Sequence, residues 1–557
     1  MSTLKPGAGA HGCADVLVQP AQSGKLAPCV HGCAAGNDVR QWIGLVAQRR
    51  KLGLSNSEAY ARAWRVLSET NPFPATLGRI CPHPCESGCN RAEKDGAVAI
   101  NALERFLGDW ALERGLALAR IEGPAGGRSV GVIGSGPAGL SFAYQLARRG
   151  HRVTVYEKRE HAGGMLRHGI PAFRLPKSVL QAEIDRIVAL GVELRLNIAV
   201  GRDVSVDELR ERHDLLFLGI GAGSAVRLGV PGEDGPGVIG GIDFLNAVNR
   251  GENMDVLDEV VVVGGGNTAI DAARTARRRG SRVTLLYRRT RAEMPAIEQE
   301  VDEALAEGVL IEFLVAPTAI RRDALGPSAV MVQRMVLGEP DESGRRRPVA
   351  VEGEIFEVPA RMVIAAVSQT IDWGGLEQLS PGANRPRTDE AGALGDGVWA
   401  GGDSLGLGIA GIAIAQGRQA AEAVHTTLTG AARKGGTRPV GTPTRDVAAD
   451  FYAECPPAHV AERPVAERIA RADLEVHETI SEDAFLQEAE RCFSCGLCNG
   501  CQYCFMYCNG GGFVRVDQAQ PGAYFALALE RCVGCGKCID LCPTGFLSPA
   551  DAVSSSV

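Results

Sequence analysis

Residues 129–160 read SVGVIGSGPAGLSFAYQLARRGHRVTVYEKRE, and this stretch decides the fold. A short apolar strand runs into Gly134-x-Gly136-x-x-Gly139, a helical pattern follows, and a second strand ends on Glu157. Glycines at these positions let the backbone turn tightly and approach a pyrophosphate, while the helix N-terminus supplies N–H donors. An acid after the second strand can accept hydrogen bonds from ribose hydroxyls. Because all parts occur in order, the stretch predicts a dinucleotide-binding βαβ unit.

A second βαβ pattern occupies residues 259–296, EVVVVGGGNTAIDAARTARRRGSRVTLLYRRTRAEMPA. Its second strand is followed by Arg288 and Arg289 instead of an acid. An acid would repel a 2′-phosphate, whereas paired guanidiniums can bind one in bidentate fashion. We therefore expect NADP(H) and not NAD(H), with a solvated arginine pair as the alternative. The residues expected at this site are Gly264, Gly266, Asn267, Ala269, Arg288 and Arg289.

Later motifs indicate that the first nucleotide is a flavin. Gly401-Gly402-Asp403 follows the run GVWA and resembles the motif in which an aspartate binds the ribityl chain or phosphate of FAD. The arrangement is similar to the two-dinucleotide-domain flavoproteins of the adrenodoxin-reductase and glutathione-reductase superfamily. Residues 90–454 contain no cysteine, which excludes the disulfide-reductase branch. The expected FAD contacts are Gly134, Gly136, Gly139, Glu157, Gly164, Gly402 and Asp403.

Length and charge exclude several other classes. A chain of 557 residues is too long for one core, and its net charge of −7 gives no reason to expect nucleic acid or an anionic membrane as a partner. No apolar stretch is long enough for a membrane span, and the first residues lack the pattern of a secretory signal. We therefore expect a cytoplasmic protein.

The 17 cysteines gather in C-x2-C and C-x3-C groups near the two ends of the chain. Disulfide scaffolds are short and secreted, so clustered spacing in a long chain favours iron–sulfur ligation. The last 60 residues hold two C-x2-C-x2-C-x3-C runs, the bacterial two-cluster ferredoxin pattern, with a zinc ribbon as the alternative. In that pattern the fourth cysteine of each run binds the other cluster. The two expected ligand sets are Cys498, Cys501, Cys504 and Cys542, and Cys532, Cys535, Cys538 and Cys508.

The stretches APCVHGCAAGNDVRQWI, NPFPATLGRICPHPCESGCNR and AINALERF resemble the glutamate synthase small-subunit family, as do GGMLRHGIPAFRLPK (163–177) and YRRTRAEMPA (287–296). The resemblance covers roughly residues 25–430 and implies two more [4Fe–4S] clusters in an N-terminal helical domain, one with a non-cysteine ligand. Relatives carry a C-x2-C pair just before the segment matching Cys29, and this chain lacks it there. We infer that Cys492 and Cys495 replace it by folding back.

By this resemblance the four clusters need sixteen ligands, and Glu104 occupies the position of the non-cysteine ligand; a surface carboxylate is the alternative. Cys13 and Cys455 are left over as ordinary thiols. The two N-terminal ligand sets implied are Cys29, Cys89, Cys492 and Cys495, and Cys33, Cys81, Cys85 and Glu104.

The expected fold is a multidomain α/β protein with two Rossmann-like domains, an N-terminal helical iron–sulfur domain and a C-terminal α+β ferredoxin domain. The expected bounds are 1–125 for the helical domain, 126–250 and 371–430 for the FAD domain, 251–370 for the NADP domain, 431–475 for a linker and 476–557 for the ferredoxin domain.

The expected function is electron transfer between NADP(H) and [4Fe–4S] clusters through FAD. No catalytic acid or base is expected, because hydride transfer needs none. The chain shows no glutaminase-like or pyrimidine-binding region, so the terminal partner is expected to be another protein: a 2-oxoacid oxidoreductase, a glutamate synthase large subunit or free ferredoxin. Two alternatives stay open, a wiring or docking subunit with a non-functional NADP site, and an electron-bifurcating flavoprotein.

Overall fold

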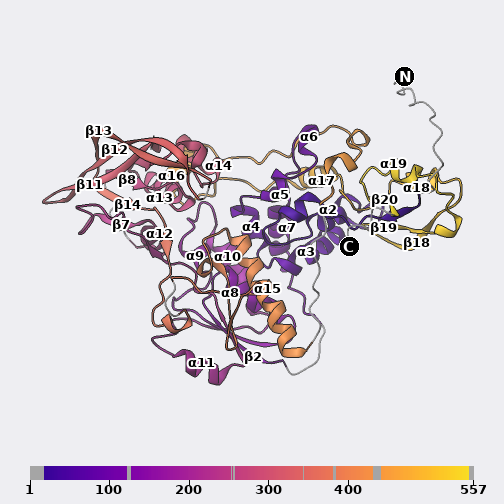
Figure 1. Ribbon diagram of the computed structural model, residues 1–557, viewed down its shortest axis with the longest axis horizontal. Coiled ribbons are helices and arrows are strands. Elements are labelled where there is room, and N and C mark those ends of the chain that lie inside the picture. The colour runs from indigo at the N-terminus through magenta and orange to yellow at the C-terminus, as the bar shows by residue number, and fades with distance from the viewer. Residues whose placement is uncertain are drawn as a thin grey trace.

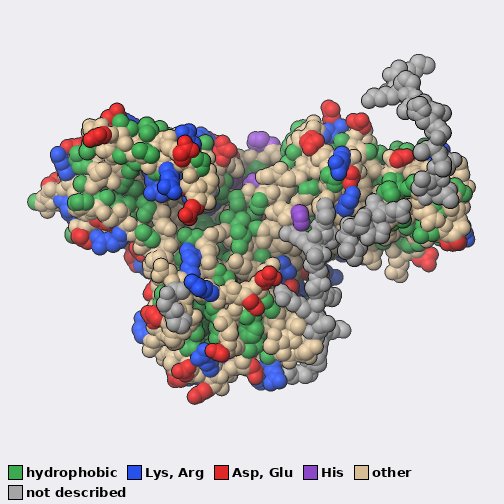
Figure 2. Space-filling view, viewed as in Figure 1, with side chains coloured by type: hydrophobic (Ala, Val, Ile, Leu, Met, Phe, Trp, Pro, Cys, Tyr) green, Lys and Arg blue, Asp and Glu red, His purple; other side chains and the backbone are tan. Residues whose placement is uncertain are grey.

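The computed structural model describes residues 18–121, 127–252, 254, 258–342, 344–380, 384–430 and 441–550, so Cys13 lies outside the described residues. The helical N-terminal domain lies at the centre, with the flavin domain below it (Figure 1). The nicotinamide domain and the ferredoxin domain lie at opposite ends. Acidic and basic side chains are interspersed on the face shown in Figure 2. Within the described residues no helix is long and apolar enough to cross a membrane.

The flavin domain is built on a six-stranded sheet in the order β16-β17-β5-β2-β3-β4. The strands from β17 to β4 are parallel, so their carboxyl ends lie along one edge. Its elements are β2 (Ser129–Ile133), α8 (Pro137–Ala147), β3 (Arg152–Tyr156), α9 (Met165–His168), α10 (Lys177–Val188), β4 (Glu193–Arg195), α11 (Val206–Arg212), β5 (Leu215–Leu218), β16 (Ala393–Gly395), β17 (Val398–Ala400) and α15 (Ala410–Thr429).

The nicotinamide domain has a five-stranded parallel sheet in the order β10-β9-β8-β14-β7 and an antiparallel sheet β11-β12-β13 beside it. The expected boundary at residue 251 placed β7 and α12 in the flavin domain. The structure moves this boundary, because β7 pairs with β14 and α12 packs into the core of the nicotinamide domain. The elements are β7 (Val238–Gly240), α12 (Gly241–Asn249), β8 (Glu259–Val263), α13 (Asn267–Arg278), β9 (Arg282–Tyr287), α14 (Glu298–Ala306), β10 (Leu310–Phe313), β11 (Val315–Asp323), β12 (Gly326–Pro340), β13 (Arg346–Pro359) and β14 (Met362–Ala365).

The N-terminal domain packs short helices around large buried side chains such as Trp42 and Tyr60, which are each 1% exposed. A helix from the far end of the chain, α17 (Glu482–Glu490), completes this core. Its Phe485 stacks on Phe106 at 4.1 Å between ring centroids. The helices are α1 (Pro28–Gly32), α2 (Val39–Ala47), α3 (Asn56–Thr70), α4 (Pro74–Ile80), α5 (Pro84–Ser87), α6 (Ala92–Asp95) and α7 (Ile100–Glu113).

The ferredoxin domain also combines both ends of the chain. Strand β1 (Pro20–Gln22) pairs antiparallel with β20 (Leu547–Pro549), a pairing that the sequence does not predict because three residues are too few to show a periodic pattern. The other elements are α18 (Tyr503–Met506), β18 (Phe513–Gln520), β19 (Ala523–Leu527), α19 (Lys537–Asp540) and β20 (Leu547–Pro549).

Residues 441–475, expected to form part of a linker, pack against two other domains. The Thr442 N–H donates to Leu26 O at 2.7 Å, on the N-terminal domain. Further along, α16 (Val465–Ala470) lies on the nicotinamide domain, where Arg278 donates to Ala472 O and Leu474 O at 3.2 and 3.1 Å. This stretch therefore contacts both the N-terminal domain and the nicotinamide domain before the chain enters α17.

Candidate functional site

A cavity of about 430 Å³ opens at the carboxyl ends of β2 and β3. It lies where dinucleotides bind in doubly wound sheets. Six of the seven residues expected to contact FAD line it, namely Gly134, Gly136, Glu157, Gly164, Gly402 and Asp403.

The glycines of this cavity form a cradle that side chains would fill. Gly134 has φ +97°, and a Cβ there would lie 2.5 Å from the carbonyl oxygen of Gly219. A Cβ on Gly139 would lie 2.1 Å from Gly134 O, where α8 crosses the strand end. Gly136, in contrast, has nothing closer than 4.0 Å, so its backbone faces open space. The cradle therefore fits a pyrophosphate at the N-terminus of α8.

Three acids line the cavity, and neighbours hold in place the two that are expected to contact FAD, Glu157 and Asp403. Glu157 accepts hydrogen bonds from Ser135 N at 3.0 Å and from Arg159 N at 3.0 Å. Ser135 Oγ donates a third at 2.5 Å, which leaves roughly one of the carboxylate's four acceptor sites for a ribose hydroxyl. Asp403 accepts from Gly408 N at 3.1 Å, and burial raises the pKa of this carboxyl. Ser135 was missed by the sequence analysis, since the x of G-x-G carries no signal.

The second turn has the same construction. A Cβ on Gly264 would lie 2.3 Å from Ala366 O, whereas a Cβ on Gly266 would meet nothing within 4 Å. Asn267 accepts a hydrogen bond from Ile297 N at 2.9 Å and so ties the start of α13 to the loop after β9. Ala269 is fully buried. The turn thus keeps an open backbone for a phosphate at the helix N-terminus.

The two arginines after β9 have different surroundings. Arg289 is 4% exposed and forms an ion pair with Asp341 at 2.6 Å, beyond the end of β12. Its Nε also donates to Arg346 O at 2.7 Å. Arg288 is exposed and makes no hydrogen bond or ion pair within the part of the chain that the structure describes. Both residues lie in the bend that follows β9, where Arg289, and not Arg288, contacts Asp341 and Arg346.

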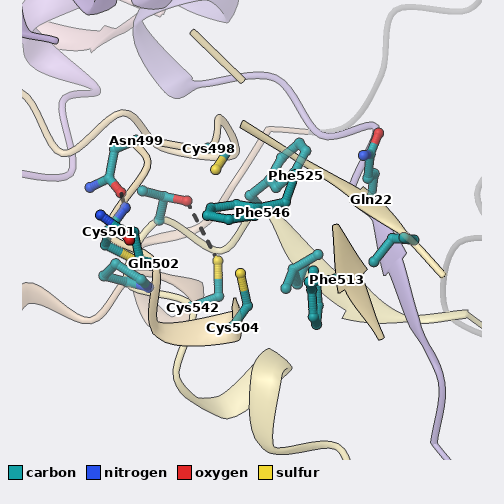
Figure 3. A pocket seen from close by; sticks show the side chains of 14 residues that line it. Gln22, Cys498, Asn499, Cys501, Gln502, Cys504, Phe513, Phe525, Cys542 and Phe546 are labelled. Atoms are coloured by element: carbon teal, nitrogen blue, oxygen red, sulfur yellow. Dashed lines mark hydrogen bonds between the residues drawn. The ribbon is translucent and has the colours of Figure 1, made fainter. Parts of the chain in front are cut away.

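Four cysteines of the ferredoxin domain surround one cavity, and they come from both C-x2-C-x2-C-x3-C runs. Figure 3 shows the sulfurs of Cys498, Cys504 and Cys542 facing the same space, beside Phe525 and Phe546. Cys501 lines it as well. In the second set, burial raises the pKa of Cys538 to about 11, and Cys532, Cys508 and Cys535 add to the rise. The structure thus brings Cys542 beside the first three cysteines of the other run, and Cys508 lies near Cys538.

A third set joins the two ends of the chain. Cys29, Cys89, Cys492 and Cys495 line one cavity inside the N-terminal domain. Burial raises the pKa of Cys492 to about 11 and that of Cys495 to about 12, so bare thiolates are disfavoured without a nearby cation. The Asn90 side chain donates to Cys495 Sγ at 3.4 Å.

Contacts of α17 with the N-terminal domain hold the third set together. Glu488 accepts from Ala99 N at 2.8 Å, and Arg491 pairs with Asp95 at 3.0 Å. Arg40 Nη1 donates to Cys495 O at 3.0 Å, directly beside the cavity. The returning segment is therefore an integral part of this domain.

The fourth set gathers Cys33, Cys81, Cys85 and Glu104. Burial raises the pKa of each thiol, and the Glu104 carboxylate adds to the rise in all three. The approach depends on close packing of α4 and α7, since a Cβ on Gly78 would lie 2.4 Å from the Arg105 backbone. The two helices thereby bring Cys81 and Glu104 to one place.

Glu104 is a buried carboxyl, 8% exposed, and not a surface group. Burial raises its pKa to about 8, against a hydrogen bond that Asn71 donates at 2.8 Å. Among the described residues it has no ion-pair partner. A buried anion without a cation is costly, so the site suits a metal ligand.

The positions of the sulfurs argue against disulfides and against a single zinc ion, the two alternatives to iron–sulfur ligation. All 16 cysteines in the described ranges are free, so none forms a disulfide. Tetrahedral zinc, with Zn–S of about 2.3 Å, would bring sulfurs to about 3.8 Å from one another. No three thiol sulfurs of the described chain lie mutually within 4.8 Å. The spacing therefore fits a larger iron–sulfur cluster better than a single ion.

The chain belongs to the pyridine nucleotide-disulphide oxidoreductase family, whose sequence pattern matches residues 128–453. Residues 21–116 match dihydropyrimidine dehydrogenase domain II with its 4Fe-4S cluster, and residues 497–546 match the 4Fe-4S dicluster domain. The predicted fold class is confirmed, and the chain is an oxidoreductase with FAD/NADP-type and iron–sulfur domains.

Three curated relatives refine the comparison. The beta subunit of NADP(+)-dependent formate dehydrogenase from Moorella thermoacetica is 39% identical over 513 residues, which cover 84% of this chain and 70% of the relative. The small chain of glutamate synthase [NADPH] from Escherichia coli (strain K12) is 35% identical, covering 72% of this chain and 88% of that one. The NADPH-Fe(3+) oxidoreductase subunit beta of Geobacter sulfurreducens (strain DL-1 / KN400) is 41% identical, covering 62% and 51%. The predicted resemblance to the glutamate synthase small-subunit family is confirmed, and the chain spans about half of the Geobacter subunit.

Proposed function

We propose that this chain is an FAD-dependent subunit that relays electrons between NADP(H) and four [4Fe–4S] clusters on behalf of a partner enzyme. The observation that carries the proposal is the presence, in one chain, of two dinucleotide cradles and four separate sets of ligands. The names of the relatives, which include NADPH-linked and NADP-dependent oxidoreductase subunits, support the choice of nicotinamide.

The described residues fit these groups. Gly134, Gly136 and Gly139 would hold the FAD pyrophosphate, Glu157 its ribose, and Asp403 the ribityl side. Bound FAD would exchange a hydride with NADP(H) and single electrons with the clusters, and this chemistry belongs to the cofactors. The chain itself orients the groups, buries them and supplies thiolates whose cost of burial iron would offset.

Each ligand set would hold one cubane cluster. The sets are Cys29, Cys89, Cys492 and Cys495; Cys33, Cys81, Cys85 and Glu104; Cys498, Cys501, Cys504 and Cys542; and Cys508, Cys532, Cys535 and Cys538. Sixteen thiolate and carboxylate ligands require a reducing compartment, which is the basis for proposing a cytoplasmic location.

Anaerobic titration of the purified chain with NADPH tests the relay. We expect NADPH to bleach the flavin absorbance, and we expect about 16 iron atoms per chain from four cubanes. Bleaching followed by cluster reduction would distinguish the relay from a subunit with a non-functional NADP site. No bleaching with a full complement of flavin and iron would refute the proposal.

The partner is proposed to be another subunit of a redox complex. Candidates are a 2-oxoacid oxidoreductase, a glutamate synthase large subunit and free ferredoxin, to which the name of the first relative adds another subunit of a formate dehydrogenase. Native co-purification followed by mass spectrometry distinguishes them. An isolated chain that reduces free ferredoxin at full rate would argue against an obligate partner.

Arg288 is the residue proposed to discriminate NADPH from NADH. Because its guanidinium is exposed and unpaired among the described residues, Arg288→Glu should weaken NADPH binding roughly 10- to 100-fold, as expected for the loss of a hydrogen bond to a charged group. NADH binding should change little. Equilibrium titration of both nucleotides measures the effect, with Arg282→Glu, at the start of β9, as the control. An equal loss for NADH and NADPH would contradict this role.

A further inference from the structure

One short segment of the flavin domain reaches into the nicotinamide domain. Gly164, Met165 and His168 line the flavin cavity. Phe173 and Arg174, five and six residues after His168, are 2% and 8% exposed and lie against α13 and α14. The segment therefore connects the flavin cavity to the helices that carry the second nucleotide turn.

Arg174 is bound by acids from two helices of the nicotinamide domain. Its Nη1 donates to both oxygens of Asp271, at 3.0 and 2.8 Å. Its Nε lies 2.7 Å from a carboxylate oxygen of Glu300, in an ion pair whose angle does not make a hydrogen bond. The side chains of Arg174 and Asp271 are 6% and 5% exposed, so water hardly competes for this ion pair.

Asp271 places this contact one turn from the nucleotide site. Helix α13 begins at Asn267, directly after the turn with Gly264 and Gly266, and Asp271 follows four residues later on the helix. Any rotation of α13 relative to the flavin domain would break the contact with Arg174. The ion pair therefore restricts the position of the second nucleotide turn relative to the flavin domain.

Two further contacts brace the same segment. The Phe173 ring lies beneath the guanidiniums of Arg274 and Arg278, at 4.8 and 4.0 Å from its centroid. Asn249, on α12, donates to His168 O at 2.9 Å and to Ile170 O at 3.2 Å. Three helices of the nicotinamide domain, α12, α13 and α14, thus contact residues 168–174 of the flavin domain.

We propose that Arg174 is a positioning residue that, through Asp271 and Glu300, sets the distance between the flavin cavity and the nicotinamide turn. The inference rests on the proposed function. Interfaces between domains of one chain are ordinarily mobile, whereas hydride transfer requires reacting atoms about 3–3.5 Å apart. A planar guanidinium held by two buried acids fixes orientation as well as distance, which a lysine cannot reproduce.

The test compares NADPH-dependent flavin reduction in Arg174→Lys, Arg174→Met and the double variant Arg174→Met/Asp271→Asn by stopped-flow spectroscopy. The double variant removes both buried charges, and Glu300 keeps its ion pair with Arg274, so folding does not depend on an unpaired carboxylate. Arg282→Met, which removes an exposed arginine from the same domain, is the matched control. NADP⁺ affinity and flavin reduction by dithionite are measured on every variant.

We expect the rate of flavin reduction at saturating NADPH to fall roughly 10- to 100-fold in all three variants, because a displacement of about 1 Å has effects of that size. NADP⁺ affinity and dithionite reduction should match wild type, and deuterated NADPH should show a hydride step that limits the rate. Unchanged rates in the flavin-loaded double variant would overturn the inference, as would a loss explained wholly by weaker NADP⁺ binding. Wild-type protein that NADPH does not bleach would instead refute the proposed function itself.

Discussion

Replacing Cys492 and Cys495 together with serine is expected to lower the iron content from about 16 to about 12 atoms per chain, the loss of one cubane. The two thiols line the same cavity as Cys29 and Cys89, so two of the four ligands of that set would be absent. NADPH should still bleach the flavin, while electron delivery to an external acceptor should fall strongly. Iron analysis and electron paramagnetic resonance of the reduced protein measure the change.

Cys455→Ser is the control for that experiment. Cys455 is half-buried, and Gln487 of α17 donates to its sulfur at 3.4 Å, but it belongs to none of the four ligand sets. Its replacement should leave iron and activity unchanged. Should the double serine variant retain about 16 iron atoms, the chain would not use its C-terminal segment to complete the N-terminal domain.

Glu307→Gln is expected to destabilise the nicotinamide domain by about 3–5 kcal/mol, the usual cost of breaking a buried charge network from one side. The Glu307 side chain is 0% exposed and pairs with Arg274 at 2.8 Å and with Arg278 at 2.7 Å. Removal of its charge would take one acidic partner from each of two buried guanidiniums, those of Arg274 and Arg278. Since Phe173 lies beneath the same guanidiniums, the flavin-domain segment should loosen as well.

Scanning calorimetry measures this effect, because domains of a large protein unfold in separate transitions. A loss of that size should lower the melting temperature of one transition by roughly 6–20 °C. The control is Glu259→Gln, which removes the partner of Arg282 in a pair whose side chains are 77% and 34% exposed, and it should cost less than about 1 kcal/mol. Equal effects of the two substitutions would mean that burial does not strengthen the Glu307 network.

The parts of the site that the sequence predicted are those built from local geometry. A strand, a glycine turn and a helix follow one another within residues 129–147 and again within residues 259–278, so the turn with Gly134 and the turn with Gly264 could be placed without knowing any distant contact. The expected exchange of Cys508 and Cys542 followed from spacing alone, because bacterial ferredoxins share one chain path.

The different surroundings of Arg288 and Arg289 could not be predicted from the sequence. Arg288 and Arg289 are adjacent in sequence, yet Asp341, 52 residues after Arg289, binds only the second of them. Both residues lie in the bend after β9, and the acid that pairs with Arg289 comes from the residue that follows β12. Only Arg288 therefore remains exposed for a nucleotide.

By itself, the sequence determined which local units this protein contains: two glycine turns that fit dinucleotides, a doubled ferredoxin motif, and the family to which they belong. Those features depend on backbone geometry and on spacing within one unit. The family resemblance implies that Cys492 and Cys495 lie beside Cys29, but only the tertiary structure decided the packing of α17 that puts them there and the position of Arg174 between Asp271 and Glu300. These partners are brought together by the burial of α17 and of the segment around Phe173, and burial is a property of the whole packed chain that no local pattern records.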